Sequence, residues 1–384
     1  MENLNYRMES LIRLRKELHK NPELSGKEFE TSKRILTFLE KYKPDEIHTE
    51  IGKTGIIAIY HGEVEGKTLL FRCELDALPI KEVNTFEHQS IYQGISHKCG
   101  HDGHMAILCG LATELAQKKL ATGKVILLFQ PSEENGKGAA KVMKNEFFKT
   151  LRPDFVFALH NLPNYSKNQI VVKKDTFTCA VTSMKIVLQG KTAHAGEPEN
   201  GINPALAMAE ITQKFHLLNQ PKLEQNDFAL ITPIYSSMGK KAYGVSAENG
   251  EIHFTIRCQQ NEEIKKLKNT LEKKVNAISK IHQLKSTVKW IEPFYANENN
   301  AEAVELISEA TKKLNYSLFE KETPFRWGED FGLFTAHYPG ALFGLGVGLE
   351  TPDLHNPDYD FPDEIIATGV KVFYQICKDV NDAR

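Results

Sequence analysis

The sequence of 384 residues is long enough to bury a sizeable core and to divide into two domains. Hydrophobic residues make up 41% and charged residues 26%, which is the balance of an ordinary globular protein. The net charge of -2 excludes a long-range field that would gather nucleic acid or anionic lipid, so we expect neither nucleic acid nor a membrane as a partner.

The N-terminal segment and the cysteines predict a cytoplasmic protein. The segment from Met1 to Leu24 has no apolar stretch after a basic start, so we expect no secretory signal. No run of the sequence approaches the roughly 20 apolar residues that span a bilayer. The six cysteines are dispersed along the chain, which suits free thiols in a reducing compartment better than a disulfide framework.

The first part of the chain and its last part predict an α/β fold. Leu11, Leu14 and Leu18 recur at helical spacing, and a second helix is expected from about 28 to 42. Four continuous apolar runs predict buried strands, and they begin at Thr68, Lys124, Asp154 and Gly340. A further helix is expected after the segment CGHDGH. Helical patterns separate the early runs, so we expect a mainly parallel sheet that is covered on both faces.

The middle of the chain predicts a different arrangement, from about Cys179 to Glu292. Its patterns run strand, helix, strand, strand, helix, strand, with a long Lys- and Glu-rich second helix over 262–282. This order is that of a split two-layer α+β unit. We therefore expect an inserted domain at 179–292, between the two parts of a catalytic domain at 1–178 and 293–384.

Potential metal ligands follow the predicted strands. Glu74 and Asp76 come after the first strand and Glu133 and Glu134 after the second, while His160 closes the third and His355 lies in the loop after the fourth. Cys99, His101, Asp102 and His104 lie directly ahead of a predicted helix. Ligands of open α/β sheets bind outside the carboxyl ends of the strands, so these side chains are expected to converge there.

Each of these residues also has an ordinary interpretation when it is taken alone. Cys99 would be a small buried residue, and Glu133 with Glu134 would be solvated surface charge. His160 would be a satisfied core histidine, and His355 a residue of a turn. The joint pattern favours a site, because all of these residues fall at one predicted edge of one sheet.

The chemistry of this set points to two metal ions. A thiolate, imidazoles and a carboxylate suit Zn²⁺, Mn²⁺, Co²⁺ or Ni²⁺. Two ions would activate a water and polarise the carbonyl under attack. If Glu134 faces the metal, Glu133 would face the water and transfer its proton. Asp76 would orient one of the metal ligands without binding the metal itself.

Seven motifs resemble a known family, nearly from end to end of the chain. They are LHKNPELSGKEFET from Leu18, ELDALPIKE from Glu74, SHKCGHDGHMA from Ser96, LLFQPSEENGKGA from Leu127, GKTAHAGEP from Gly190, GEDFGLF from Gly328 and LHNPDYDFPDE from Leu354. The family is that of the N-acyl-amino-acid amidohydrolases, in the hippurate hydrolase and indole-acetyl-amino-acid hydrolase branch of the aminoacylase and carboxypeptidase metallopeptidase clan.

The resemblance implies roles for individual residues. The implied ligands of two divalent metal ions are Cys99, His101, Glu134, His160 and His355. Glu133 is implied as the general base, and His194 as a lid residue that binds the developing oxyanion. Arg257 matches a lid arginine that would hold the substrate carboxylate, although a surface salt bridge remains an alternative. Without the resemblance, His194 would be an ordinary loop histidine.

The resemblance also implies a fold and a partner. The catalytic α/β domain would be interrupted by a lid domain, which in relatives pairs two subunits, so a homodimer is expected. The chain departs from the family at Glu74, where Asp is usual, and at 244–247, where Gly-Val-Ser-Ala replaces the usual Asn-Val-Ile-Pro. Because the missing Asn removes a side-chain donor, substrate specificity does not carry over. Trp327 beside Glu329 and Asp330 is a third difference that bears on the pocket.

The expected activity is hydrolysis of the amide bond of small N-acyl amino acids or similar amines. A dipeptidase or carboxypeptidase with the same two-metal site is the alternative within that chemistry. A thiol hydrolase with Cys99 as nucleophile and His101 or His104 as base is a second alternative. A degenerate homologue kept as a binding protein is a third, and the complete ligand set argues against it.

Overall fold

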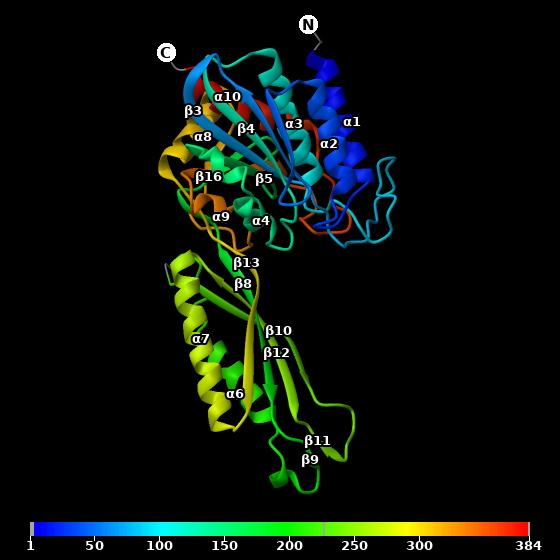
Figure 1. The fold of residues 1–384 in the computed structure, drawn as a ribbon, viewed down its shortest axis with the longest axis vertical. Helices are drawn as coiled ribbons and strands as arrows, with labels where there is room; N and C mark the ends of the chain where they lie inside the picture. Colours follow the sequence, from blue (N-terminus) through cyan, green and yellow to red (C-terminus); the bar gives the residue numbers. More distant parts are fainter. Residues whose placement is uncertain (1–3, 226, 383–384) are drawn as a thin grey trace. The chain divides into compact units, whose positions relative to one another are not determined.

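The computed structural model describes residues 4–225 and 227–382, and the chain forms two compact units (Figure 1). The first unit, here called the α/β unit, comprises Met1–Phe177, Asn297–Glu322 and Glu329–Arg384. The second, called the α+β unit, comprises Thr178–Ala296 and Thr323–Gly328. The α+β unit is therefore built mainly from one continuous insertion into the sequence of the α/β unit.

The α/β unit is organised around an eight-stranded sheet with the order β1-β2-β4-β3-β5-β16-β6-β15. Its four central strands are mutually parallel, and they are β4 (Thr122–Gln130), β3 (Val64–Glu74), β5 (Phe155–Pro163) and β16 (Gly340–Gly348). These are the four strands that the apolar runs predict, so the mainly parallel α/β fold is confirmed. At one edge β1 (Glu46–Ile51) and β2 (Gly55–His61) are antiparallel, and at the other lie β6 (Ile170–Val172) and β15 (Leu318–Glu320).

Burial of aromatic and aliphatic side chains explains why these strands lie at the centre. Phe71 of β3 stacks against Phe157 of β5 and also contacts Phe373, and all three rings are buried. Full burial of such a side chain contributes about 1.5–3 kcal/mol relative to leaving it in water. Parallel strands that are covered by helices need this continuous apolar character, which alternating strands lack.

The helices of the α/β unit complete its core. They are α1 (Leu4–Lys20), α2 (Phe29–Lys41), α3 (His101–Gln117), α4 (Gly138–Lys144), α5 (Phe148–Leu151), α8 (Ala301–Lys313), α9 (Gly332–Thr335) and α10 (Ile366–Asn381), with a 3-10 turn at Asp363–Ile365. The helix expected after the CGHDGH segment is α3, which begins earlier, at His101 within that segment, and almost all of its residues are buried. Helices α1 and α2 confirm the first two predicted helices.

The α+β unit has a four-stranded antiparallel sheet with the order β10-β12-β8-β13. Its elements follow the predicted order and are β8 (Ala180–Gln189), α6 (Ala205–His216), β10 (Ala229–Met238), β12 (Asn249–Cys258), α7 (Asn261–Ile281) and β13 (Lys285–Phe294). A short two-stranded antiparallel sheet pairs β9 (Ala193–His194) with β11 (Val245–Ser246), and a 3-10 turn covers Pro198–Asn200. The helices and the sheet enclose a separate core that includes Phe215, Phe254 and Leu271.

Two remaining features complete the description. A two-stranded sheet joins β7 (Asp175–Thr178) and β14 (Asn297–Asn299). Within residues 4–225 and 227–382, none of the helices has the length and apolar character that crossing a bilayer requires.

Candidate metal centre

The five predicted ligands come from four separate segments of the α/β unit. Cys99 lies in the loop before α3, His101 is the first residue of α3, and His160 is in β5. Glu134 lies in the turn after β4, and His355 in the loop after β16. Because β4, β5 and β16 are parallel strands of one sheet, with β3 between β4 and β5, their carboxyl ends bring these side chains to the same edge of the sheet.

The structure brings these five side chains together as two overlapping groups. The donor atoms of Cys99, His101 and His160 lie within 4.8 Å of one another, and so do those of Cys99, Glu134 and His355. The Cys99 Sγ lies 3.5 Å from His160 Nε2. Glu134 Oε1 lies 3.9 Å from His101 Nε2, and Glu134 Oε2 lies 3.9 Å from His355 Nε2. Cys99 belongs to both groups, as expected of a thiolate shared by two ions.

The hydrogen bonds of two histidines aim their second ring nitrogens at this centre. His101 Nδ1 lies 2.9 Å from the main-chain oxygen of Asp76, and His160 Nδ1 lies 2.9 Å from that of Asn161. A carbonyl oxygen can only accept, so each Nδ1 carries the proton and each Nε2 presents a lone pair. His101 Nε2 and Glu134 Oε1 are buried and have no hydrogen-bond partner among the residues that the structure describes. Buried donor atoms left in this way fit a metal site.

The charges around the centre agree with this interpretation. Burial raises the pKa of Glu133 and of Glu134, and neighbouring carboxyl groups raise both further. Burial likewise raises the pKa of the Cys99 thiol, to which Glu134 adds. Burial lowers the pKa of His160 and of His355, which keeps both rings neutral, the form that binds metal. Divalent cations would offset this concentration of buried acidic groups.

Asp76 fixes the turn that carries the two adjacent glutamates. Its Oδ1 accepts the main-chain N–H of Glu133 at 3.1 Å, and its Oδ2 accepts that of Glu134 at 3.0 Å. The hydroxyl of Ser25 donates to Oδ2 at 2.6 Å. Asp76 therefore acts on the turn through its carboxylate and on His101 through its main-chain oxygen. The Glu133 carboxylate lies beside the centre, with Oε2 4.0 Å from His101 Nε2.

His104 does not face the centre with a free nitrogen. Its Nδ1 lies 2.6 Å from Glu74 Oε2, and its Nε2 accepts the main-chain N–H of Asn161 at 3.2 Å. Both ring nitrogens are thus engaged, which removes His104 as a base for a thiol nucleophile.

Sequence reasoning missed a buried ion network behind the centre. Arg72 of β3 is completely buried and pairs with Glu74, with Glu329 Oε1 at 3.0 Å and with Asp330 Oδ1 at 2.7 Å. Gln130 donates to the same Asp330 carboxylate at 2.8 Å. Glu329 and Asp330, which the sequence placed beside Trp327 near a pocket, are therefore partners of Arg72. The sequence does contain a signal for this network, which is an arginine inside an apolar run. A buried charge requires partners of opposite charge.

The α+β unit carries the other two predicted site residues, His194 and Arg257. His194 is exposed on β9, opposite Val245 of β11, and its Nδ1 accepts the main-chain N–H of Gly196 at 3.1 Å. Arg257 of β12 donates to the main-chain oxygen of Arg326 at 2.6 Å. Within the described part of the chain no carboxylate pairs with Arg257, so the surface salt bridge considered from the sequence is not formed there.

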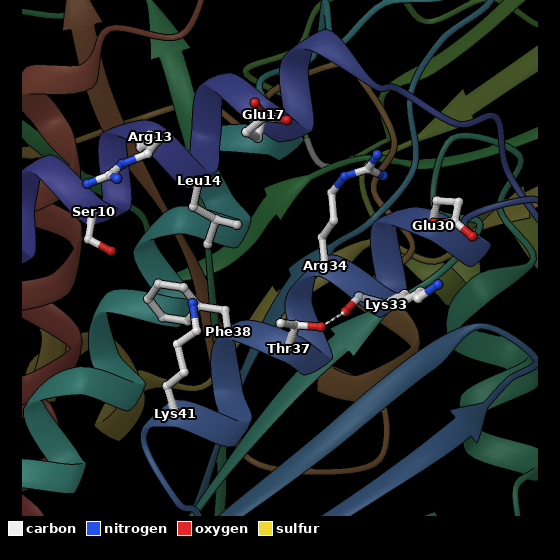
Figure 2. A pocket seen from close by; sticks show the side chains of 10 residues that line it. All are labelled: Ser10, Arg13, Leu14, Glu17, Glu30, Lys33, Arg34, Thr37, Phe38 and Lys41. Atoms are coloured by element: carbon white, nitrogen blue, oxygen red, sulfur yellow. Dashed lines mark hydrogen bonds between the residues drawn. The ribbon is translucent and has the colours of Figure 1, made fainter.

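A hollow on the α/β unit contains none of the predicted site residues. Figure 2 shows the side chains that line a groove between α1 and α2. The volume of this groove is about 450 Å³. Its lining consists of Ser10, Arg13, Leu14, Glu17, Glu30, Lys33, Arg34, Thr37, Phe38 and Lys41. The lining carries four cationic side chains and only two carboxylates, which are too few to form a metal-ligand set, so the centre described above remains the candidate site.

Known proteins resemble this chain along nearly its whole length. It is 30% identical to an N-acetyldiaminopimelate deacetylase of Priestia megaterium, over 88% of this chain and 90% of that protein. It is 31% identical to an N-acetyl-L-cysteine deacetylase of Bacillus subtilis, over 99% of this chain and 90% of that protein. The crystal structure of the Bacillus subtilis YXEP protein, described as a dinuclear metal binding peptidase, superposes with a TM-score of 0.85 at 27% identity and covers 100% of both chains. Residues 70–379 match the sequence profile of peptidase family M20/M25/M40, and the chain therefore belongs to that family.

Proposed function

We propose that this chain is a metal-dependent amidohydrolase that releases the amino acid from N-acyl amino acids. The observation that carries the proposal is the pair of donor groups that share Cys99, with the carboxylate of Glu133 beside them. The relatives support the choice of bond, because those named above are deacetylases of N-acetylated amino acids. A carboxypeptidase or dipeptidase would use the same centre, but it is not what these names favour.

The donor set would hold two divalent ions, drawn from Zn²⁺, Mn²⁺, Co²⁺ and Ni²⁺. Cys99, His101 and His160 would hold one ion, and Cys99, Glu134 and His355 the other. When bound, two ions supply acidification of a water and polarisation of the amide carbonyl. The dinuclear description of the YXEP protein supports this number of ions.

Glu133 is assigned the proton transfers of the reaction. Its carboxylate takes a proton from the attacking water and returns it to the leaving amine, as a general base and then a general acid. Asp76 holds the main-chain N–H groups of Glu133 and Glu134, so the neighbouring carboxylates keep separate positions. One is then available to the ions and the other to the water.

His194 and Arg257 are assigned to the substrate. Because the N–H of Gly196 donates to His194 Nδ1, a neutral His194 ring carries its proton on Nε2 and can donate from there. That hydrogen bond would stabilise the oxyanion of the tetrahedral intermediate, an effect worth about 3 kcal/mol for a well-placed donor. Arg257 would hold the carboxylate of the amino-acid part.

We also propose that the inserted segment at 179–292 is a lid domain through which two copies of the chain pair. Strand β10 supports this proposal, because it is an edge strand of its sheet and exposes Ile234, Tyr235 and Met238. Open edges with apolar side chains tend to pair with another chain. All six cysteines are buried as free thiols, which supports a reducing, cytoplasmic location. The partners are then a small acylated amino acid and a second copy, with no role for nucleic acid or a membrane.

The proposal is tested by measuring amine release from N-acetyl, N-benzoyl and indole-acetyl amino acids and from simple dipeptides. The protein is stripped with a chelator and then supplied with one of the four metals at a time. Metal-restored hydrolysis of acyl amino acids is the expected result. Hydrolysis that survives complete stripping would contradict the metal mechanism, and a clear preference for dipeptides would contradict the substrate class.

A further inference from the structure

The loop that carries His355 is held differently from the segments that carry the other histidines of the centre. The rings of His101 and His160 are each fixed by a hydrogen bond from Nδ1 to a main-chain oxygen. The side chain of His355 is 52% exposed, and its ring hydrogen-bonds to none of the described residues. The backbone of His355 has a φ of +67°, an angle that residues other than glycine rarely adopt. The position of His355 must therefore be set through the main chain.

One residue, Lys98, holds both ends of that loop. The main-chain N–H of His355 donates to the main-chain oxygen of Lys98 at 2.8 Å. The ammonium group of Lys98 donates to the main-chain oxygen of Tyr359 at 2.7 Å. Lys98 also precedes Cys99 in the sequence, so it joins the segment of the shared thiol to the segment of His355.

The side chain of Lys98 is buried completely, and its charge is paired inside the protein. Its second partner is the carboxylate of Glu82, which also lies 2.9 Å from His19 Nε2 and accepts the main-chain N–H of Ser90 at 2.7 Å. Lysine is rarely buried to this degree because an ammonium group is costly to remove from water. The Glu82 carboxylate offsets that cost, and the remaining hydrogen bond of the ammonium group is the one to the His355 loop.

The other end of Tyr359 contacts a different ligand segment. Its hydroxyl accepts a hydrogen bond from the side-chain amide of Asn161, the residue after His160. The main-chain oxygen of Tyr359 thus binds the His355 loop to Lys98, while its hydroxyl contacts the strand that carries His160. Changes at Lys98 and at the Tyr359 hydroxyl should consequently affect different donor groups.

We propose that Lys98 is a positioning residue for His355 and thereby sets the affinity of the ion that Cys99, Glu134 and His355 would hold. The inference rests on the two-ion centre of the proposed function and adds to it a residue outside the ligand set. Loss of a partner that orients a ligand typically weakens metal binding about 10- to 100-fold.

The test compares two variants that differ only at Lys98. Glu82→Gln removes the charge of the pair but leaves the Lys98 contact with Tyr359. The double variant Lys98→Met/Glu82→Gln removes that contact as well, without leaving a buried carboxylate unpaired, so it is less prone to unfold than Lys98→Met alone. His355→Ala serves as the reference for loss of that ion, and Tyr359→Phe as the reference for the His160 side.

Binding of Co²⁺ to each stripped protein is followed by calorimetry and by the absorption of the cobalt–thiolate bond. We expect two ions of unchanged affinity in Glu82→Gln. In the double variant one dissociation constant should rise about 10- to 100-fold, for the same ion that His355→Ala loses. If both affinities of the double variant are unchanged, or if both fall equally, the proposed role of Lys98 is wrong while the proposed function still stands. A wild-type chain that binds no ion would contradict the proposed function itself.

Discussion

The two buried histidines of the centre in the α/β unit and the candidate histidine of the α+β unit are held in opposite ways. In the α/β unit, His101 and His160 are buried with one ring nitrogen bonded to the main chain. In the α+β unit, His194 is exposed on a two-residue strand, and its ring Nδ1 accepts the nearby main-chain N–H of Gly196. A metal centre needs donor atoms fixed before the ion arrives, whereas a substrate contact has to form and break in each cycle. The difference predicts where a substitution changes metal binding and where it changes turnover alone.

The largest expected effect is that of Glu133→Gln. The side chain keeps its size but loses its basicity, so turnover should fall by about two to four decades. Metal content, measured by mass spectrometry, should stay at the wild-type value because Glu133 lies outside both donor groups. Near-normal turnover in this variant would remove Glu133 from the proton transfers.

His194→Ala should lower kcat about 10²- to 10³-fold, because one donor to the oxyanion is lost. Metal affinity should be unchanged, which distinguishes this histidine from those of the α/β unit. His216→Ala is a matched control, since His216 is another exposed histidine of the α+β unit and should leave kcat as it is. Loss of metal in His194→Ala, or equal losses of kcat in the two variants, would break the comparison.

The buried polar cluster beside the centre predicts a pH dependence of stability. Burial acts to lower the pKa of His19, but Asp102 and Glu82 on its two ring nitrogens outweigh it and raise the pKa to about 9. The charged His19 ring therefore contributes its full stabilisation of the folded state below pH 6.5, the pKa of the unfolded state. This stabilisation is lost as the pH rises to about 9, the pKa in the folded state. The free energy of unfolding should fall by roughly 3 kcal/mol across that window.

That change is measured by urea unfolding of the metal-stripped protein, together with His19→Gln as the comparison. The variant should be less stable at pH 6.5, and its stability should vary less up to pH 9. Parallel pH profiles for the two proteins would show that the His19 ring is not charged in the folded state.

The smallest expected effect is that of Arg257→Gln, about tenfold in KM with little change in kcat. Such a change is expected when a contact stabilises the bound substrate and the transition state equally. Arg326→Gln is the control, because it keeps the main-chain oxygen to which Arg257 donates. An unchanged KM for acyl amino acids would remove Arg257 from substrate binding.

The sequence predicts the centre of the fold better than its edges, for a physical reason. The strands β3, β4, β5 and β16 are continuous apolar runs because they are buried on both faces, and such runs are visible in one sequence. The edge strand β15 and its neighbour β6 have three residues each, too few to show a pattern. Strand β1 reads EIHTEI and is mostly polar, so nothing distinguishes it from a loop.

In the candidate site, too, the sequence predicts the positions of residues within their own segments but not their partners from distant segments. The placement of Glu134 and Cys99 beside strand and helix ends follows from the order of elements, whereas His160, which is expected from the sequence to close its strand, lies inside β5, which runs on to Pro163. The structure brings Cys99 together with each of the other two side chains. The partners of Arg72 and Lys98 could not be assigned, because Glu329 and Tyr359 are more than 250 residues away along the chain. The orienting role expected of Asp76 extends to two main-chain N–H groups, which no side-chain pattern reveals.

The central claim is that one thiolate joins two donor groups into a two-ion centre. X-ray diffraction from crystals loaded with Zn²⁺, recorded on both sides of the zinc absorption edge, tests this claim directly. The account predicts two anomalous peaks, each about 2.3 Å from the Cys99 sulfur, one with His101 and His160 and the other with Glu134 and His355. A single peak, or two peaks of which either lies away from Cys99, would contradict it.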